Sequence, residues 1–176
     1  PKYQGKIDQI NVISEINKDL MSDKRMFRIL QGDVGSGKTI VSLIAISNVI
    51  ESNFQCAMMA PTEILAKQHY NLASQIFKNH NIKIDLLTGK TENKKRKKIL
   101  NDLKENVTKL VIGTHTLFQK KINFKNLGLI IIDEQHKFGV KQRMSLAQKG
   151  GDNCDVLLMS ATPIPRTMMM AIYGDM

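Results

Sequence analysis

Cysteines are scarce in this sequence and long apolar runs are missing, and both absences narrow the class of protein. The two cysteines, Cys56 and Cys154, stand alone within apolar stretches and lack the paired spacing of metal ligands. We therefore interpret them as buried small hydrophobic residues and expect neither a disulfide bond nor a zinc site. No apolar run approaches the roughly 18 residues of a membrane span. The N-terminal residues lack the charged-then-apolar pattern of a signal peptide, so we expect a cytoplasmic protein without a membrane partner.

Acidic residues are also few relative to basic ones. The chain has 26 Lys and Arg against 16 Asp and Glu, a formal net charge of +10. A polyanionic partner would suit this excess, but most of the basic residues are lysines in a chain rich in Asn and Ile, which is typical of a composition bias. The charge alone is weak support for nucleic acid binding. With 176 residues, 42% of them hydrophobic, the chain fits one domain, which we expect to be monomeric.

The stretch from Gly32 to Thr39, Gly-Asp-Val-Gly-Ser-Gly-Lys-Thr, has the spacing G-x-x-x-x-G-K-[ST] of a phosphate-binding P-loop. An apolar strand at 26–30 precedes it and an apolar helix at 40–50 follows it, which is the context that the motif requires. Glycines allow consecutive backbone N–H groups to point at phosphate oxygens. The predicted nucleotide-binding residues of this stretch are Gly32, Asp33, Val34, Gly35, Ser36, Gly37, Lys38 and Thr39.

Two residues at the end of this stretch have separate predicted tasks. Lys38 would reach the β- and γ-phosphates as a catalytic cation, and the Thr39 hydroxyl would bind Mg²⁺. The helix that begins near Lys38 would add the positive end of its dipole beneath the same phosphates. The alternative is a glycine-rich turn before an ordinary helix, but the strand, glycines, Lys-Thr pair and helix together favour the P-loop.

Strand-like and helix-like segments alternate along the chain and predict an α/β fold. Continuous apolar strands are what a parallel sheet demands when helices cover both of its faces. The expected helices are 7–21, 40–50, 62–78 and 91–103, and the expected strands are 26–30, 55–60, 83–87, 110–113, 129–132 and 154–159, with a polar helical stretch between the last two strands. Thr91 is predicted to cap the helix that follows it. We interpret the basic run at 94–98 as a solvated face, with a phosphate contact as the alternative.

A second chemical site follows an apolar strand in the sequence Asp133-Glu134-Gln135-His136. In doubly wound folds ligands bind beyond the carboxyl ends of the strands, so both carboxylates would emerge on the same edge as the P-loop. Asp133 would hold Mg²⁺ through a coordinated water, and Glu134 would orient or deprotonate the water that attacks the γ-phosphate. The alternative is an acidic turn that caps the next helix. Paired with the P-loop, however, the motif predicts a nucleoside triphosphatase, an enzyme that hydrolyses its nucleotide.

These motifs, taken in order with three others, resemble those of superfamily 2 helicases. The motif from Asp133 to His136 resembles that of the DEAH/DExH class, and its one-letter sequence in this chain is DEQH, so we call it the DEQH box. The whole set is similar to the RecG family of bacterial branched-DNA helicases over residues 9–176; it comprises 31–39, 60–66, 113–115, 133–140 and 160–167. The nearest alternative is the Mfd family of transcription-repair coupling factors, which typically has Glu at the position of Gln135 and Phe at that of Ser36. PriA shares less of the pattern.

The resemblance implies a RecA-like P-loop sandwich and roles for further residues. Gln9 would recognise adenine and favour ATP, while Gln135 and His136 would bridge the catalytic and DNA sites. The segments implied to track DNA phosphates contain Pro61, Thr62, Glu63, Gly113, Thr114 and His115. Ser160, Ala161 and Thr162 would couple the ATP state to the DNA grip, on a strand between the P-loop strand and the Asp133 strand. Taken singly, the histidines His69, His80 and His115 have a simpler interpretation as surface or loop residues.

The resemblance also implies an N-terminal wedge domain that engages the branch point and a second RecA-like lobe with arginine fingers. We find neither in this sequence, and an arginine finger contributes roughly a thousandfold or more in rate, so we expect the chain to be nearly inactive alone. We interpret it as the N-terminal motor lobe of an ATP-dependent DNA helicase that remodels stalled forks and recombination junctions. Two alternatives stay open: an Mfd-like translocase that displaces RNA polymerase, and a P-loop switch that moves no nucleic acid.

Overall fold

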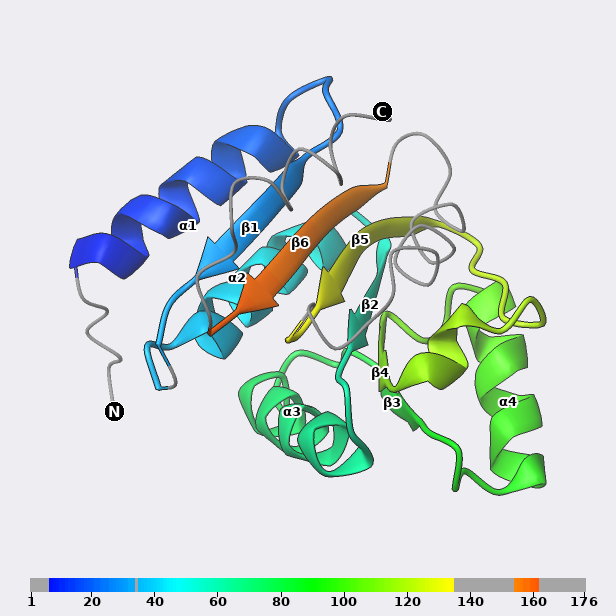
Figure 1. Cartoon of the computed structure of the whole chain (residues 1–176). Coiled ribbons are helices and arrows are strands. Elements are labelled where there is room, and N and C mark those ends of the chain that lie inside the picture. The colour runs from blue at the N-terminus through cyan, green and yellow to red at the C-terminus, as the bar shows by residue number, and fades with distance from the viewer. Residues whose placement is uncertain (1–6, 34, 135–153, 162–176) are drawn as a thin grey trace.

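The computed structural model describes residues 7–33, 35–134 and 154–161, whose strands form a single parallel sheet (Figure 1). The helices are α1 (Ile7–Leu20), α2 (Lys38–Glu51), α3 (Glu63–Ile76), α4 (Asn93–Lys104) and the short 3₁₀ helix η1 (His115–Phe118). The strands are β1 (Phe27–Gln31), β2 (Gln55–Met59), β3 (Ile84–Leu87), β4 (Leu110–Gly113), β5 (Leu127–Ile132) and β6 (Asp155–Ser160). Their order across the sheet is β1-β6-β5-β2-β4-β3, and each neighbouring pair is parallel. The predicted α/β fold is confirmed.

Helices cover both faces of the sheet, which explains why its strands are apolar throughout. Side chains alternate across a strand, so Cys56 and Met58 of β2 pack into one core while Ala57 and Met59 pack into the other. The first core includes residues of α1, α2 and α3, and the second includes Ile99 and Leu103 of α4. Within the described ranges, no helix is both long and apolar enough to cross a membrane.

Both cysteines are buried, as the sequence predicted, and both are free thiols. Burial raises the pKa of the Cys56 thiol well above its ordinary value, and it raises the pKa of Cys154 to about 12. Burial has this effect because it disfavours the charged thiolate. The two side chains therefore act as small hydrophobic residues of the cores, as expected.

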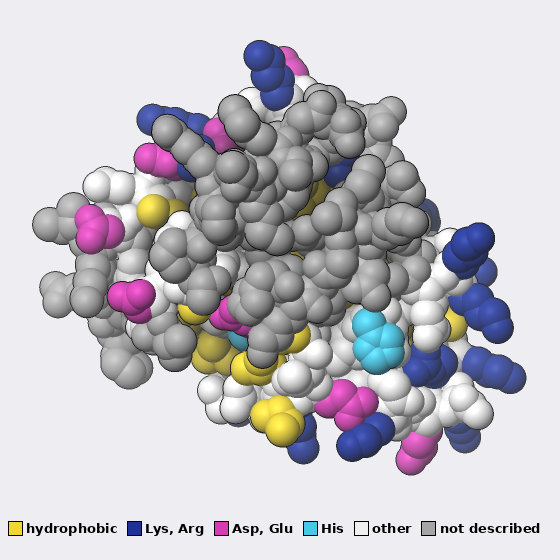
Figure 2. Space-filling view, in the orientation of Figure 1, with side chains coloured by type: hydrophobic (Ala, Val, Ile, Leu, Met, Phe, Trp, Pro, Cys, Tyr) yellow, Lys and Arg dark blue, Asp and Glu magenta, His cyan; other side chains and the backbone are white. Residues whose placement is uncertain are grey.

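The start of α4 corrects one expectation and confirms another. The predicted cap at Thr91 is wrong, because Glu92 is the N-cap residue and makes no side-chain capping bond. The Thr91 hydroxyl instead accepts a hydrogen bond of 2.9 Å from the Thr88 N–H and so closes the preceding turn. The lysines at 94, 95, 97 and 98 are exposed, and Figure 2 shows Lys and Arg side chains gathered on this side of the molecule. The polar helical stretch expected between the last two strands lies outside the described residues.

Gly113 ends β4 at a place with no room for a side chain. A Cβ atom there would collide with the Leu87 carbonyl oxygen of β3 and lie 3.1 Å from Leu117 Cγ. We therefore expect Gly113→Ala to lower the free energy of unfolding by about 1–3 kcal/mol in urea titrations. Gly89→Ala is the matched control, since its added carbon meets only the Glu63 carboxylate at an ordinary 3.5 Å. Equal losses of stability in the two variants would contradict this account of the packing.

Candidate active site

The P-loop connects the end of β1 to the start of α2 and has the backbone conformation that its glycines allow. Gly35 and Gly37 have φ angles of 82° and 86°, a region in which a side chain would be strained. Gly37 is the N-cap residue of α2 and, as a glycine, makes no side-chain capping bond to that helix. The N–H groups that point out of the start of a helix and the positive end of the helix dipole both favour an anion at this position. Val34 lies outside the described residues.

Lys38 lies over this loop. Its ammonium donates hydrogen bonds to the carbonyl oxygens of Gly32 and Asp33, the second at 2.9 Å. Thr39 follows in the first turn of α2 and is half-buried. The cation and the hydroxyl are thus both held at the helix end to which an anion would be drawn.

Strand β6 lies between β1, which leads into the P-loop, and β5, which leads into Asp133 and Glu134. It pairs with β1 on one side and with β5 on the other, as the resemblance implied. Ser160, its last residue, is fully buried and lies opposite Gln31, and its carbonyl accepts a hydrogen bond of 3.2 Å from the Gly32 N–H. Ala161 follows and is half-buried, and Thr162 lies outside the described residues. The start of the P-loop is therefore bonded directly to the end of β6.

Asp133 and Glu134 follow β5 directly and reach the same edge of the sheet. The Asp133 N–H donates to the Met59 carbonyl at 2.8 Å, which continues the pairing of β5 with β2. Glu134 is half-buried and has a φ of 49°, a left-handed conformation. For a residue other than glycine this backbone costs on the order of 1–3 kcal/mol, and such residues cluster at active sites. Gln135 and His136 lie outside the described residues.

His69 is the residue that sequence analysis missed. The interpretation of His69 as a surface or loop histidine is wrong: it is only 8% exposed, and its Nε2 lies 2.7 Å from Asp133 Oδ2. His80 and His115 are exposed, as expected. A signal was available, because His69 shares the i, i+3, i+7 spacing of the buried face of α3 with Ala66 and Ala73.

Gln9 brings α1 to the P-loop. Its side-chain amide donates a hydrogen bond of 2.6 Å to the Ser36 carbonyl, across 27 positions of sequence. The first turn of α1 therefore lies against the loop.

The two segments implied to track DNA phosphates lie together at the same edge. The Ala60 N–H donates to the Gly113 carbonyl at 2.9 Å, which joins the ends of β2 and β4 just before Pro61 and Thr114. Thr62 is exposed and caps α3, its hydroxyl accepting from the Leu65 N–H at 3.2 Å. We name these segments, residues 61–63 and 113–115, the β2–β4 edge.

Side chains on the β2–β4 edge differ in their access to solvent. Thr62 and His115 are exposed, and Pro61 and Glu63 are half-buried. Thr114 is only 2% exposed, and within the described part of the chain its hydroxyl has no hydrogen-bond partner. The Thr114 side chain therefore departs from the expected surface position.

The residues present fit Mg²⁺ rather than a metal held by the protein alone. Thr39 and Asp133 offer a hydroxyl and a carboxylate, the oxygen ligands that this cation prefers. The described ranges contain no cluster of three or more His, Cys, Asp or Glu residues that could hold a metal ion. This donor set suits Mg²⁺, which usually keeps several waters and takes further oxygens from substrate phosphates.

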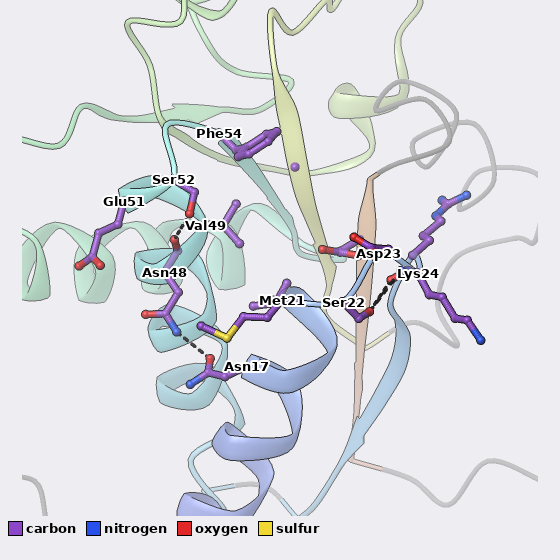
Figure 3. A pocket seen from close by; sticks show the side chains of 14 residues that line it. Asn17, Met21, Ser22, Asp23, Lys24, Asn48, Val49, Glu51, Ser52 and Phe54 are labelled. Atoms are coloured by element: carbon purple, nitrogen blue, oxygen red, sulfur yellow. Dashed lines mark hydrogen bonds between the residues drawn. The ribbon is translucent and has the colours of Figure 1, made fainter.

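A cavity of about 780 Å³ lies apart from these residues (Figure 3). It is lined by the end of α1, the end of α2 and the residues near the starts of β5 and β6, including Met21, Phe54, Gly128 and Asp155. These are the amino ends of the strands, whereas the P-loop and Asp133 follow carboxyl ends. The cavity is therefore not part of the candidate site.

Comparison with known proteins matches the chain to one family. The family model for DEAD/DEAH box helicases matches residues 7–171. The chain is 53% identical to the ATP-dependent DNA helicase RecG of Thermotoga maritima, over 92% of this chain and 21% of that protein. It is 50% identical to RecG of Aquifex aeolicus, over 96% of this chain and 21% of that protein.

Solved structures agree with the sequence comparisons. A structure of RecG bound to a three-way DNA junction has a TM-score of 0.85 and 46% identity, covering 99% of this chain and 23% of that one. The helicase domain of Pyrococcus furiosus Hef, at 22% identity, shows the shared fold with a TM-score of 0.74, covering 97% of this chain and 36% of that one. The chain spans about a fifth to a quarter of the RecG proteins it matches. By its sequence, its fold and the placement of its motifs, the chain belongs to the DEAD/DEAH box helicase family.

Proposed function

We propose that the chain is the N-terminal RecA-like lobe of a RecG-like DNA helicase, in which ATP hydrolysis drives the remodelling of branched DNA. The observation that carries this proposal is the sheet edge at which the P-loop, Ser160, Asp133 and the β2–β4 edge follow neighbouring strands. The names of the similar proteins support the activity, and the junction in the solved RecG structure supports the substrate.

The P-loop binds the phosphates of ATP in this proposal. Backbone N–H groups of the loop and the first turn of α2 donate to phosphate oxygens. Lys38 exchanges its two bonds to neutral carbonyl oxygens for bonds to oxygens of the β- and γ-phosphates, where the acceptor is charged as well as the donor. Gln9, held against Ser36, reads the adenine edge.

Two carboxylates then divide the work of hydrolysis. Thr39 and Asp133 would hold Mg²⁺, which would neutralise charge that develops on the phosphate oxygens. Glu134 accepts a proton from the attacking water, and the left-handed backbone at this residue fixes where its side chain leaves the strand. Gln135 and His136 follow in sequence and bridge toward the DNA side.

DNA binds along the β2–β4 edge through its phosphates, which gives affinity and position but little sequence information. Pro61, Thr62, Glu63, Gly113 and His115 form the contact, together with backbone groups at Thr114. Ser160, Ala161 and Thr162 transmit the ATP state, since β6 is bonded to the P-loop and paired with the Asp133 strand. A second RecA-like lobe and a wedge domain of the full-length protein complete the motor.

Replacing Lys38 tests the nucleotide site in this chain itself. We expect Lys38→Ala to lower the affinity for ADP with Mg²⁺ at least about tenfold, because a bond to a charged group contributes roughly 1.5–3 kcal/mol. Isothermal titration calorimetry gives the affinity directly. Lys24→Ala is the matched control, an exposed lysine that lines the cavity at the opposite edge. Equal affinities for Lys38→Ala and the unmodified chain would contradict the phosphate assignment.

A further inference from the structure

Asp133 has a partner outside the two motifs that predict its role. His69 of α3 lies 64 positions earlier in the sequence, and its Nε2 approaches Asp133 Oδ2 to 2.7 Å. Each residue is only 8% exposed. Because a carboxylate accepts hydrogen bonds, Nε2 is the donor and carries the proton. The pair is thus a buried hydrogen bond between a helix and the strand end that carries the proposed Mg²⁺ ligand.

The surroundings of His69 indicate that this contact is specific. Among the buried residues of α3, His69 lies between Ala66 and Ala73, both fully buried and part of the apolar core. Burying an imidazole on such a face costs free energy unless its ring nitrogens are hydrogen-bonded. Because His69 is buried, that hydrogen bond has to come from a protein group such as Asp133.

The bond to His69 supplies an orientation that the backbone does not. The Asp133 N–H, bonded to the Met59 carbonyl, fixes the main chain. The carboxylate can still rotate about its side-chain torsions, and the bond to Oδ2 restricts that rotation. Carboxylates that bind metals are commonly held by an outer hydrogen bond, and loss of such a partner typically costs 10–100-fold in metal affinity or activity.

Helix α3 also connects this carboxylate to the β2–β4 edge. The helix begins at its cap Thr62, and His69 follows seven residues later, about 10 Å along the axis. The same rigid element therefore contacts Asp133 and starts at the surface proposed to receive DNA.

We propose that His69 is a positioning residue, which holds the Asp133 carboxylate toward Mg²⁺ and joins that carboxylate to the helix that starts at the β2–β4 edge. The inference rests on the proposed function, in which Asp133 serves the Mg²⁺ of bound nucleotide. His69 itself touches neither the nucleotide nor the metal in this account.

The test compares two amides at position 69 in the full-length protein. In His69→Gln the amide nitrogen can reach the place of Nε2, whereas in His69→Asn it falls short of Asp133. Calorimetry measures ADP affinity over a series of Mg²⁺ concentrations and in EDTA. Mg²⁺ should raise the ADP affinity of His69→Asn about tenfold less than it raises that of the wild type, while the ADP affinity in EDTA should be unchanged. In His69→Gln, most of the increase caused by Mg²⁺ should be retained. His80→Asn, at an exposed histidine, should match the wild type.

A reference variant separates the possible failures. If Asp133→Asn loses the Mg²⁺ gain but His69→Asn keeps it, the role of His69 is overturned and the proposed function stands. If Asp133→Asn keeps the gain, the proposed Mg²⁺ role of Asp133 fails. If His69→Asn and His69→Gln lost ADP affinity equally in EDTA and both had a lowered melting temperature, His69 would only support the fold. That result would also overturn the inference.

Junction DNA tests the connection through α3 in the same titration. In the wild type and in His69→Gln, DNA should shift the Mg²⁺ concentration at half-maximal ADP affinity, because coupling between two sites is reciprocal. In His69→Asn the shift should be lost. The same shift in all three proteins would contradict a connection through His69.

Discussion

A Glu134→Gln variant of the full-length protein is expected to bind ATP as well as the wild type and to hydrolyse it about 10²–10⁴ times more slowly. The amide fills nearly the same volume as the carboxylate but cannot accept a proton from the attacking water. The left-handed backbone at this position, with a φ of 49°, serves either side chain equally, so the loop should keep its shape. A nucleotide-binding titration and steady-state phosphate release measure the two quantities separately.

Two controls make the Glu134→Gln result interpretable. Glu105→Gln, at the exposed C-cap residue that follows α4, should hydrolyse ATP at the wild-type rate. Asp133→Asn should lose Mg²⁺-dependent affinity as well as turnover, which distinguishes the metal ligand from the base. Normal hydrolysis by Glu134→Gln would remove Glu134 from the mechanism.

Replacement of Ser160 and Thr162 by Ala in the full-length protein is expected to separate hydrolysis from unwinding. Ser160 ends the strand that lies between the P-loop strand and the Asp133 strand, and its carbonyl bonds to Gly32. The hydroxyls have little direct part in the chemistry, so DNA-stimulated hydrolysis should stay largely present. Fork unwinding should fall by up to about a hundredfold, the upper range of coupling between sites.

The double variant needs checks on stability and on DNA binding. Loss of a buried hydroxyl's partner costs about 1–3 kcal/mol, and Ser160 is fully buried, so thermal unfolding must stay near that of the wild type. DNA affinities must be compared at one salt concentration, because phosphate contacts are strongly salt-dependent. A parallel fall in hydrolysis and unwinding, with the fold intact, would place both residues in the catalytic site and exclude the coupling role.

Local signals in the sequence were sufficient to predict the four α-helices and six strands of the described residues, together with their α/β class. The P-loop glycines, the apolar strands and the helical periodicity are patterns of residues that lie close together in the sequence. The structure contains the loop, the strands and the helices that these patterns predict. The position of β6 between β1 and β5 came from the family resemblance, since no local pattern specifies strand order.

Contacts between distant segments could not be predicted in the same way. The pair of His69 and Asp133 spans 64 positions, and neither residue carries a local mark of the other. Thr91 shows a different limit: the residue type suits a helix cap, but its hydroxyl is taken by the turn that begins at Thr88. Thr114 shows a third, because burial at the end of β4 depends on packing that a motif does not record.

The central claim is that this lobe belongs to a motor that DNA branches activate. The most direct measurement is the ATP hydrolysis rate of the full-length protein, taken without DNA, with linear duplex and with a three-way junction of equal length and salt. We predict strong stimulation by the junction, abolished in Lys38→Ala. A hydrolysis rate indifferent to all DNA would contradict the account and favour a nucleotide switch that moves no nucleic acid.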